Sequence, residues 1–187
     1  MNTAGFSARD LAEHVLLVDE NDAVLATSGK IPAHQSGRLH RAFSVFLVDG
    51  AGRVLIQQRA LKKYHSGGLW ANSCCGHPRP GEDVVSAAER RVFEELGVRC
   101  RLRKGFTSRY RARLDRNMTE NELVHVLFGT CGSVSNLNPD EVRTVRWIPA
   151  HDLKSLVNSC PHRYTAWMLH YMRQHHEQIV EHVLSHL

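Results

Sequence analysis

The sequence predicts a single domain of the α/β class, and three observations support this prediction. The chain has 187 residues, a length at which one domain is usual and a core forms without disulfides or metal. Its apolar fraction of 42% and charged fraction of 23% are those of an ordinary globular protein. Short strand-like segments are interspersed with helical ones, and no repeat or low-complexity linker divides them. We therefore expect one domain over residues 1–187.

The individual elements follow from apolar patterning and from turn residues. One pair of strands flanks a turn-like stretch at residues 19–22, and another flanks Asp49-Gly50-Ala51-Gly52, which is a hairpin signal. A helix is expected from about Asp83 to Glu95, after the Pro80-Gly81 break and before Gly97, a residue typical of helix C-termini. The predicted strands are His14–Val18, Ala23–Ala26, Ala42–Val48, Val54–Gln58, Glu122–Thr130 and Thr144–Ile148, and further helices are predicted at Pro149–Val157 and about 162–186.

The net charge of +5 suits an anionic small molecule as well as a nucleic acid. Eight basic residues are concentrated between Arg99 and Arg116. On strands, their i, i+2 spacing places each arginine triplet on one face. We interpret them as a solvated strand face, because nucleic-acid binding would require interleaved aromatic residues and a recognisable motif.

Cysteine usage and the length of apolar runs bear on location. The chain has five cysteines, two of them adjacent (Cys74 and Cys75), and no C-x-x-C pair, which predicts a reduced, cytoplasmic protein. The apolar runs, such as residues 15–18, are far shorter than the roughly 18 residues that span a bilayer. The N-terminal residues also lack the apolar stretch of a signal peptide. We expect no membrane partner.

The most informative stretch runs from Gly76 to Val98. A loop containing glycine and proline leads into a helix with carboxylates near both ends, and such carboxylates can hold a Mg²⁺ ion bound to a diphosphate. On composition alone, a helix with surface ion pairs is the better explanation. The spacing nevertheless resembles the signature of the Nudix superfamily, in which these residues fall in register: Gly76, Glu82, Arg90, Val92, Glu94, Glu95, Gly97 and Val98. Arg91 stands where the hydrolases of this superfamily carry a metal-binding glutamate, which argues against diphosphate hydrolysis.

Three further groups carry side chains suited to proton transfer or metal binding. Cys75 precedes a histidine by two residues in a glycine-containing loop and can serve as acid, base or nucleophile, although a free cysteine is usually an inert core residue. Glu120 and Glu122 leave a strand from the same face and can share one cation, the alternative being an exposed strand edge. His34 and His40 lie on a predicted loop and are weak evidence by themselves.

Together these groups resemble one family, the type I isopentenyl diphosphate isomerases. The resemblance extends from about His14 to Trp167 and is carried by these motifs: Arg38-Leu39-His40-x-Ala42-Phe43-Ser44, Arg59-Ala60-Leu61-x-Lys63, Trp70-x-Asn72-Ser73-x-Cys75-Gly76-His77-Pro78, Glu95-Leu96-Gly97, Tyr110-Arg111-Ala112 and Glu120-Asn121-Glu122. Bacterial members of this family also carry arginine at the position of Arg91. The resemblance implies the Nudix fold, a mixed β-sheet sandwiched between helices. It also implies interconversion of isopentenyl diphosphate and dimethylallyl diphosphate through a tertiary carbocation.

The resemblance further assigns roles to four catalytic residues. Cys75 and Glu122 are expected on opposite faces of the substrate, where one delivers a proton and the other removes one. Which of the two is the acid cannot be decided from the sequence. Tyr110 is expected to assist as a hydrogen-bonding or proton-relay partner. Trp167 is expected to present its π-face to the cation, the alternative being a helix core residue.

Metal and substrate ligands are implied in the same way. One Mn²⁺ or Zn²⁺ per chain is expected on the side chains of His34, His40, His77, Glu120 and Glu122, since imidazoles with carboxylates suit a borderline ion. A Mg²⁺ ion is expected between the diphosphate, Glu95 and the backbone carbonyl of Cys75. Direct diphosphate contacts are expected from Lys30, Arg59, Lys63 and Arg91.

Two alternatives remain at this point. A Nudix diphosphohydrolase acting on a nucleoside diphosphate derivative shares the fold but does not require Cys75, His77 and the Glu120-x-Glu122 pair. A metal- or RNA-binding module explains only the basic stretch, and we expect no nucleic-acid partner. We expect a small-molecule diphosphate as the substrate and a monomer or weak homodimer as the assembly.

Overall fold

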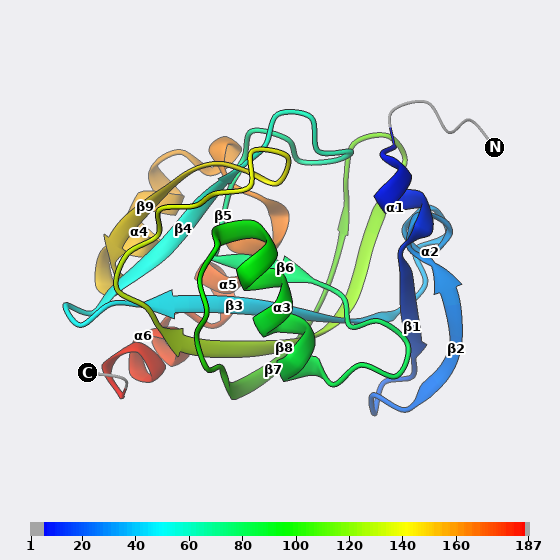
Figure 1. Cartoon of the computed structure of the whole chain (residues 1–187), viewed down its shortest axis with the longest axis horizontal. Helices are drawn as coiled ribbons and strands as arrows, with labels where there is room; N and C mark the ends of the chain where they lie inside the picture. Colours follow the sequence, from blue (N-terminus) through cyan, green and yellow to red (C-terminus); the bar gives the residue numbers. More distant parts are fainter. Residues whose placement is uncertain (1–5, 186–187) are drawn as a thin grey trace.

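A sheet of nine strands runs through the middle of the structure. The computed structural model describes residues 6–185, and Figure 1 shows the sheet with its helices. The elements in chain order are α1 Ala8–Ala12, β1 His14–Val18, β2 Val24–Gly29, α2 Lys30–Ser36, β3 His40–Val48, β4 Arg53–Arg59, β5 Trp70–Ala71, β6 Cys74–Gly76, α3 Val84–Leu96, β7 Arg103–Arg113, β8 Thr119–Thr130, β9 Val142–Pro149, η1 Ala150–Asp152, α4 Leu153–Ser159, η2 Pro161–Arg163, α5 Ala166–Gln174 and α6 His176–Leu184.

The sheet is mixed, as the sequence predicts. Strand β3 pairs in parallel with β8 from His40↔Glu122 to Val48↔Thr130. It pairs antiparallel with β1, β4 and β6, while β7 pairs antiparallel with β8 and β9 with β4. Because β3 is paired with so many strands, it lies at the centre of the sheet.

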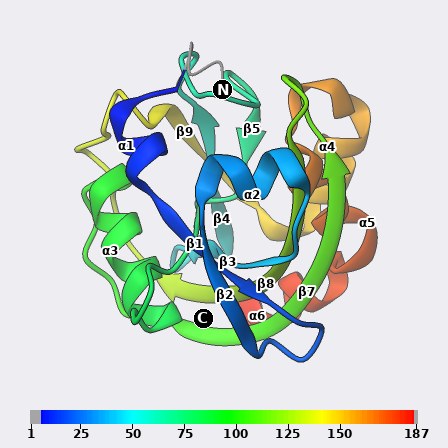
Figure 2. The same ribbon diagram turned by 90° about the vertical axis from the view of Figure 1, so that its right-hand side faces the viewer.

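Helices cover both faces of the sheet. Phe43, Val45 and Leu47 of β3 pack in the core beneath α3, whereas Ala42 and Phe46 pack in the core beneath α5 and α6. This alternation has the period of two that a strand buried on both faces requires. Figure 2 shows α3 on one side of the sheet and α5 on the other. The predicted sandwich is therefore confirmed.

Helix α3 begins and ends where the sequence predicts. The carboxylate of Asp83 caps its first turn by accepting hydrogen bonds from the amides of Val85 and Ser86. Gly97 ends the helix with φ 69°, a left-handed conformation that glycine adopts without strain. The helix buries Ala88 and Val92 against the sheet. Its position also fixes Arg91 and Glu95, which are buried like Ala88 and Val92.

Two predictions about helices are wrong. His34 lies on helix α2 and His40 on the first residue of β3, so the two histidines are not on a loop. The sequence pattern did not indicate this short helix, because it contains Pro32 and ends at Gly37. Pro32 does not break the helix, since it lies in the first turn, where proline is tolerated, and Gly37 ends the helix at φ 63°. In place of the predicted helix at about 162–186, the structure has the end of the 3-10 helix η2 and then two helices, α5 and α6, which are separated at His175. Its last predicted residue, position 186, lies outside the described residues.

The basic stretch matches its prediction in part. Arg109, Arg111 and Arg113 are exposed on β7 and alternate with buried or half-buried residues, so they form a solvated face. Arg99 and Arg101 precede the strand, so the first arginine triplet, Arg99, Arg101 and Arg103, does not share a strand face.

All five cysteines are free. Within residues 6–185, no helix has both the length and the apolar character needed to cross a membrane.

Candidate active site

The strand register brings residues that are distant in sequence close together, beside and within one pocket. His40 of β3 and Tyr110 of β7 both lie opposite Glu122 of β8. Ser44 of β3 lies opposite Cys75 of β6. The pocket beside these strands is lined by basic residues, carboxylates and aromatic rings, among them Lys30, Ser44, Arg59, Lys63, Tyr64, His65, Cys75, His77, Arg91, Glu95, Tyr110, Glu120, Glu122 and Trp167.

A cluster of imidazoles and carboxylates adjoins the pocket, which its members His77, Glu120 and Glu122 line. Glu120 and Glu122 leave β8 from the same face, and both are buried. The separation between His77 Nε2 and Glu122 Oε1 is 2.9 Å, that between His40 Nε2 and the same oxygen is 3.6 Å, and that between His34 Nε2 and Glu120 Oε2 is 3.2 Å. Ligand atoms of His34, His40, His77 and Glu122 all lie within 4.8 Å of one another. The five residues predicted to bind a metal are therefore brought together.

The ring orientations in this cluster suit a bound cation. The Nδ1 atoms of His34 and His40 lie 2.7 Å and 2.8 Å from the carbonyl oxygens of Lys30 and Arg38. Since a carbonyl oxygen only accepts, each Nδ1 carries the hydrogen and each Nε2 offers a lone pair. His34 Nε2, His40 Nε2 and Glu120 Oε2 are buried without a hydrogen-bond partner in the described structure. Buried atoms of this kind are normally satisfied, and a cation between them would satisfy all three.

Glu122 also contacts a residue outside the histidine cluster. The Tyr110 hydroxyl donates a hydrogen bond to Glu122 Oε2 at 2.8 Å. Burial alone raises the pKa of the Glu122 carboxyl, but His40 and Tyr110 beside it hold this pKa below its usual value. Glu122 is therefore a carboxylate with one oxygen turned to the histidines and the other to Tyr110.

Cys75 lies in the same pocket as a hydrogen-bonded thiol. Its Sγ donates to Asn72 Oδ1 at 3.1 Å and lies 3.3 Å from Ser44 Oγ. Ser44 in turn accepts a hydrogen bond from the Tyr171 hydroxyl at 2.7 Å. Burial raises the pKa of the Cys75 thiol to about 12, although the bonds to Ser44 and Asn72 oppose this rise. The neighbouring Cys74 points into the core on the α3 side of the sheet.

Trp167 borders the pocket from helix α5. Its side chain is buried, and its Nε1 has no hydrogen-bond partner among the described residues. The guanidinium of Arg59 lies over the ring, 5.2 Å from its centroid, in a cation–π contact. The ring is thus placed both to pack in the core and to interact with positive charge.

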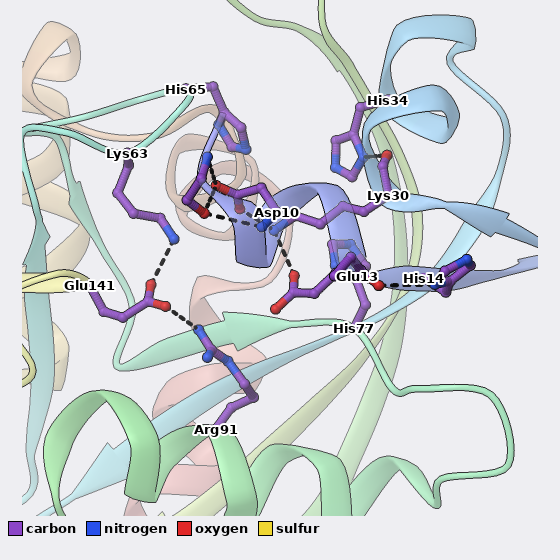
Figure 3. A network of polar contacts seen from close by, with 12 residues as sticks. Asp10, Glu13, His14, Lys30, His34, Lys63, His65, His77, Arg91 and Glu141 are labelled. Carbon is purple, nitrogen blue, oxygen red and sulfur yellow. Dashed lines mark hydrogen bonds and ion pairs between the residues drawn. The ribbon is translucent and has the colours of Figure 1, made fainter. Parts of the chain in front are cut away.

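The four predicted diphosphate ligands converge on the pocket, but acidic partners hold three of them (Figure 3). Lys30 forms ion pairs with Asp10 at 2.9 Å and Glu13 at 2.7 Å. Lys63 pairs with Glu141 at 2.7 Å, and Arg91 pairs with the same carboxylate at 3.2 Å. Arg91 also pairs with Glu94 at 2.7 Å and closely with Glu95. Glu95 additionally accepts a hydrogen bond from Gln57 Nε2 at 3.0 Å.

Sequence reasoning missed several residues of the site. Glu141 joins two of the predicted diphosphate ligands, yet it follows an ordinary Asn-Pro-Asp turn that carries no signal of this role. Asp10 and Glu13 come from the N-terminal helix and the residue after it. His65 lies beside Glu120, 3.6 Å from Nε2 to Oε1, in a loop with no metal-binding spacing. Burial and the nearby Arg59 hold the pKa of His65 well below its usual value.

Comparisons with known proteins agree with this architecture. A model of the NUDIX domain matches residues 38–168. A solved Deinococcus radiodurans protein, DR0079, superposes with a TM-score of 0.72 at 20% identity and covers 87% of this chain and 98% of its own. A MutT NUDIX hydrolase from Burkholderia pseudomallei superposes with a TM-score of 0.56 at 21% identity, covering 73% and 98%. The chain is thus a NUDIX-domain protein.

Curated relatives define the family more narrowly. An isopentenyl-diphosphate Delta-isomerase 1 of Aromatoleum aromaticum is 46% identical over 84% of this chain and 89% of its own length. The isopentenyl-diphosphate Delta-isomerase of Pectobacterium atrosepticum is 46% identical over 82% and 86%. That of Streptomyces coelicolor is 44% identical over 87% and 84%. The chain belongs to the isopentenyl-diphosphate Delta-isomerase family.

Proposed function

We propose that this protein interconverts isopentenyl diphosphate and dimethylallyl diphosphate by moving a proton onto one carbon and removing a proton from another. The observation that carries the proposal is the joint placement of Cys75 and Glu122 in one buried pocket. The pocket is lined both by members of the histidine–carboxylate cluster, His77, Glu120 and Glu122, and by basic side chains. Such a pocket suits a substrate with an alkene at one end and a diphosphate at the other.

The reaction requires an acid and a base at different carbons. Protonation of the terminal alkene carbon leaves a tertiary carbocation, and loss of a proton from the neighbouring methylene group forms the new double bond. Cys75 and Glu122 serve as the two proton-transfer groups, on opposite faces of the substrate. Because the reaction is reversible, the group that donates in one direction accepts in the other. Tyr110 supports Glu122 through its 2.8 Å hydrogen bond.

The intermediate cation needs a surrounding that stabilises positive charge and excludes water. The Trp167 ring supplies a π-face for this purpose. In the described structure Arg59 lies over that ring, and Arg59 is also a proposed diphosphate ligand. Movement of Arg59 toward the diphosphate frees the ring for the cation.

Two metal sites belong to this proposal. His34, His40, His77, Glu120 and Glu122 would hold one Mn²⁺ or Zn²⁺, which fits the unpartnered buried atoms of the cluster. This ion would fix the Glu122 carboxylate and tune its acidity. Glu95 and the Cys75 carbonyl would hold a Mg²⁺ ion on the diphosphate.

The basic residues would bind the diphosphate without cleaving it. Lys30, Lys63 and Arg91 already face acidic residues, so diphosphate binding exchanges carboxylates for phosphate oxygens. Arg91 occupies the position of a hydrolytic metal ligand in the NUDIX hydrolases and presents a fork of donors suited to phosphate. The hydrolase alternative is therefore not favoured.

We further propose a cytoplasmic location and a monomeric or weakly dimeric state. Cell fractionation tests the location, and light scattering tests the oligomeric state.

The experiment follows the diphosphate by phosphorus NMR. Purified wild-type protein with Mg²⁺ and Mn²⁺ should convert isopentenyl diphosphate to dimethylallyl diphosphate, with both phosphorus signals retained and no inorganic phosphate. Glu122→Gln should abolish the conversion. Glu20→Gln is the control, because the exposed Glu20 pairs with Arg109 at the surface, and it should remain active. Release of phosphate without dimethylallyl diphosphate would contradict the proposal.

A further inference from the structure

His65 forms a second compact group with two of the proposed metal ligands. Ligand atoms of His34, His65 and Glu120 lie within 4.8 Å of one another, and all three residues are buried. His65 Nε2 lies 3.6 Å from Glu120 Oε1, while the other oxygen, Oε2, lies 3.2 Å from His34 Nε2. The two imidazoles therefore approach different oxygens of one carboxylate. Figure 3 shows His65 and His34 reaching into the site from separate segments.

The surroundings of His65 favour one of its two neutral tautomers. Its Nδ1 lies 3.1 Å from the Ser66 hydroxyl oxygen. The ionised Glu120 carboxylate only accepts hydrogen bonds, so the favourable arrangement has the hydrogen on Nε2 of His65 and the Ser66 hydroxyl donating to Nδ1. With its hydrogen on Nε2, His65 has no lone pair to offer a cation on the Glu120 side.

The ring of His65 is also held in place by its neighbours. Tyr64 packs edge-on against it at a centroid distance of 4.4 Å and 88°, and Trp167 does so at 6.1 Å and 83°. The guanidinium of Arg59 donates to the His65 carbonyl at 3.3 Å. The packing of Tyr64 and Trp167 restrains the ring, so the Nε2–H group keeps its direction toward Glu120.

We infer that His65 is a positioning residue of the metal site. Its Nε2–H group, 3.6 Å from Glu120 Oε1, attracts this oxygen, so that Oε2, the oxygen buried without a hydrogen-bond partner, would be presented beside His34 to the cation. This inference rests on the metal site of the proposed function and adds to it a partner outside the ligand set. Residues that orient a ligating carboxylate in this way typically change metal affinity by about 10–100-fold.

Mn²⁺ titration of metal-free protein tests this role without relying on turnover. His65→Leu should weaken Mn²⁺ binding about 10–100-fold. His65→Gln should restore most of the affinity, because its side-chain amide can still direct an N–H group toward Glu120, whereas the shorter amide of His65→Asn should not. His125→Leu is the matched control, since His125 also contacts a carboxylate, Asp22 Oδ2 at 2.9 Å, and it should bind Mn²⁺ like the wild type.

The number of imidazole nitrogens on Mn²⁺, measured by electron spin-echo spectroscopy, completes the test. His65→Gln saturated with Mn²⁺ should show the wild-type number of coordinated nitrogens. Loss of one nitrogen would overturn the inference and make His65 a ligand. Wild-type affinity in both His65→Leu and His65→Asn would also overturn it, because the contact with Glu120 would then have no effect. If the wild-type protein itself bound no Mn²⁺, the proposed metal site would fail together with the inference.

Discussion

Replacing the two adjacent cysteines one at a time separates the effect of a packing defect on activity from the effect of losing a proton-transfer group. Cys74 and Cys75 are consecutive on β6, so their side chains leave opposite faces of the sheet. Cys74 is fully buried in the core beneath α3, while Cys75 lines the pocket and bonds Asn72. Alanine at either position deletes one sulfur atom. The two variants therefore differ mainly in which side of the sheet loses that atom.

The expected stability costs of the two replacements are similar. Cys74→Ala leaves a small cavity in a packed core, which costs about 1–2 kcal/mol by analogy with the loss of one buried methylene group. Cys75→Ala leaves the buried Asn72 Oδ1 without its thiol donor, which costs about 1–3 kcal/mol. Both costs are smaller than the roughly 5–15 kcal/mol by which domains are stable. Both variants should therefore fold.

The expected activities differ greatly. Cys75→Ala removes a proton-transfer group, which should lower the rate about 10²–10⁴-fold, or about 3–5 kcal/mol of barrier. Cys74→Ala should retain activity within a few-fold. Cys75→Ser should keep the bonds to Asn72 and Ser44 yet remain impaired, because a hydroxyl is a weaker acid than a thiol.

The assay pairs proton NMR of the conversion with thermal unfolding followed by circular dichroism. The reasoning is refuted if Cys74→Ala and Cys75→Ala lose activity equally while both unfold near the wild-type temperature. In that case the pocket would not depend on the Cys75 thiol.

The remaining predictions concern metal binding, substrate binding and acid stability. His40→Ala and His77→Ala should each lower the content of bound Mn²⁺ or Zn²⁺ and lower turnover, and elemental analysis that finds unchanged metal in both would make these residues structural. Arg91→Lys keeps the positive charge opposite Glu141 but loses the planar fork of the guanidinium group. Steady-state kinetics should therefore show mainly a raised KM. An unchanged KM would exclude Arg91 from the diphosphate site. Burial opposes ionisation of Asp10, but Lys30 and the hydrogen bond from Ser7 together outweigh burial and lower the pKa of this carboxyl from 3.8 to about 2. The contribution of Asp10 to stability is therefore present above pH 3.8 and is lost as the pH falls through 2. Urea unfolding should therefore find Asp10→Asn less stable by about 1 kcal/mol at pH 7, with a difference that shrinks between pH 4 and pH 2; a constant difference would contradict this assignment.

Much of the fold and the site was predictable because local patterns determine them. The apolar strands β3, β4 and β8 and the capped helix α3 lie where their patterning predicts. The i, i+2 spacing of Glu120 and Glu122 is sufficient to place both carboxylates on one face. The resemblance then named His34, His40 and His77 as their partners. The parallel pairing of β3 with β8, which places His40 opposite Glu122, explains why this grouping occurs.

The features that escaped prediction depend on tertiary contacts. Helix α2 has seven residues, too few for a helical period to be recognised. Glu141 and His65 lie in loops, and their partners Arg91 and Glu120 are far away in the sequence. No local spacing indicates such pairs, because the path of the chain alone brings them together.

The central claim, proton transfer at carbon with an intact diphosphate, is tested most directly by isotope incorporation. The protein is incubated with isopentenyl diphosphate, Mg²⁺ and Mn²⁺ in deuterated water, and the product is analysed by mass spectrometry and NMR. Since one proton arrives from an enzyme acid that exchanges with solvent, the dimethylallyl diphosphate formed should carry deuterium and both phosphates. Phosphate release without deuterium in any carbon–hydrogen position would contradict the account and favour a diphosphohydrolase.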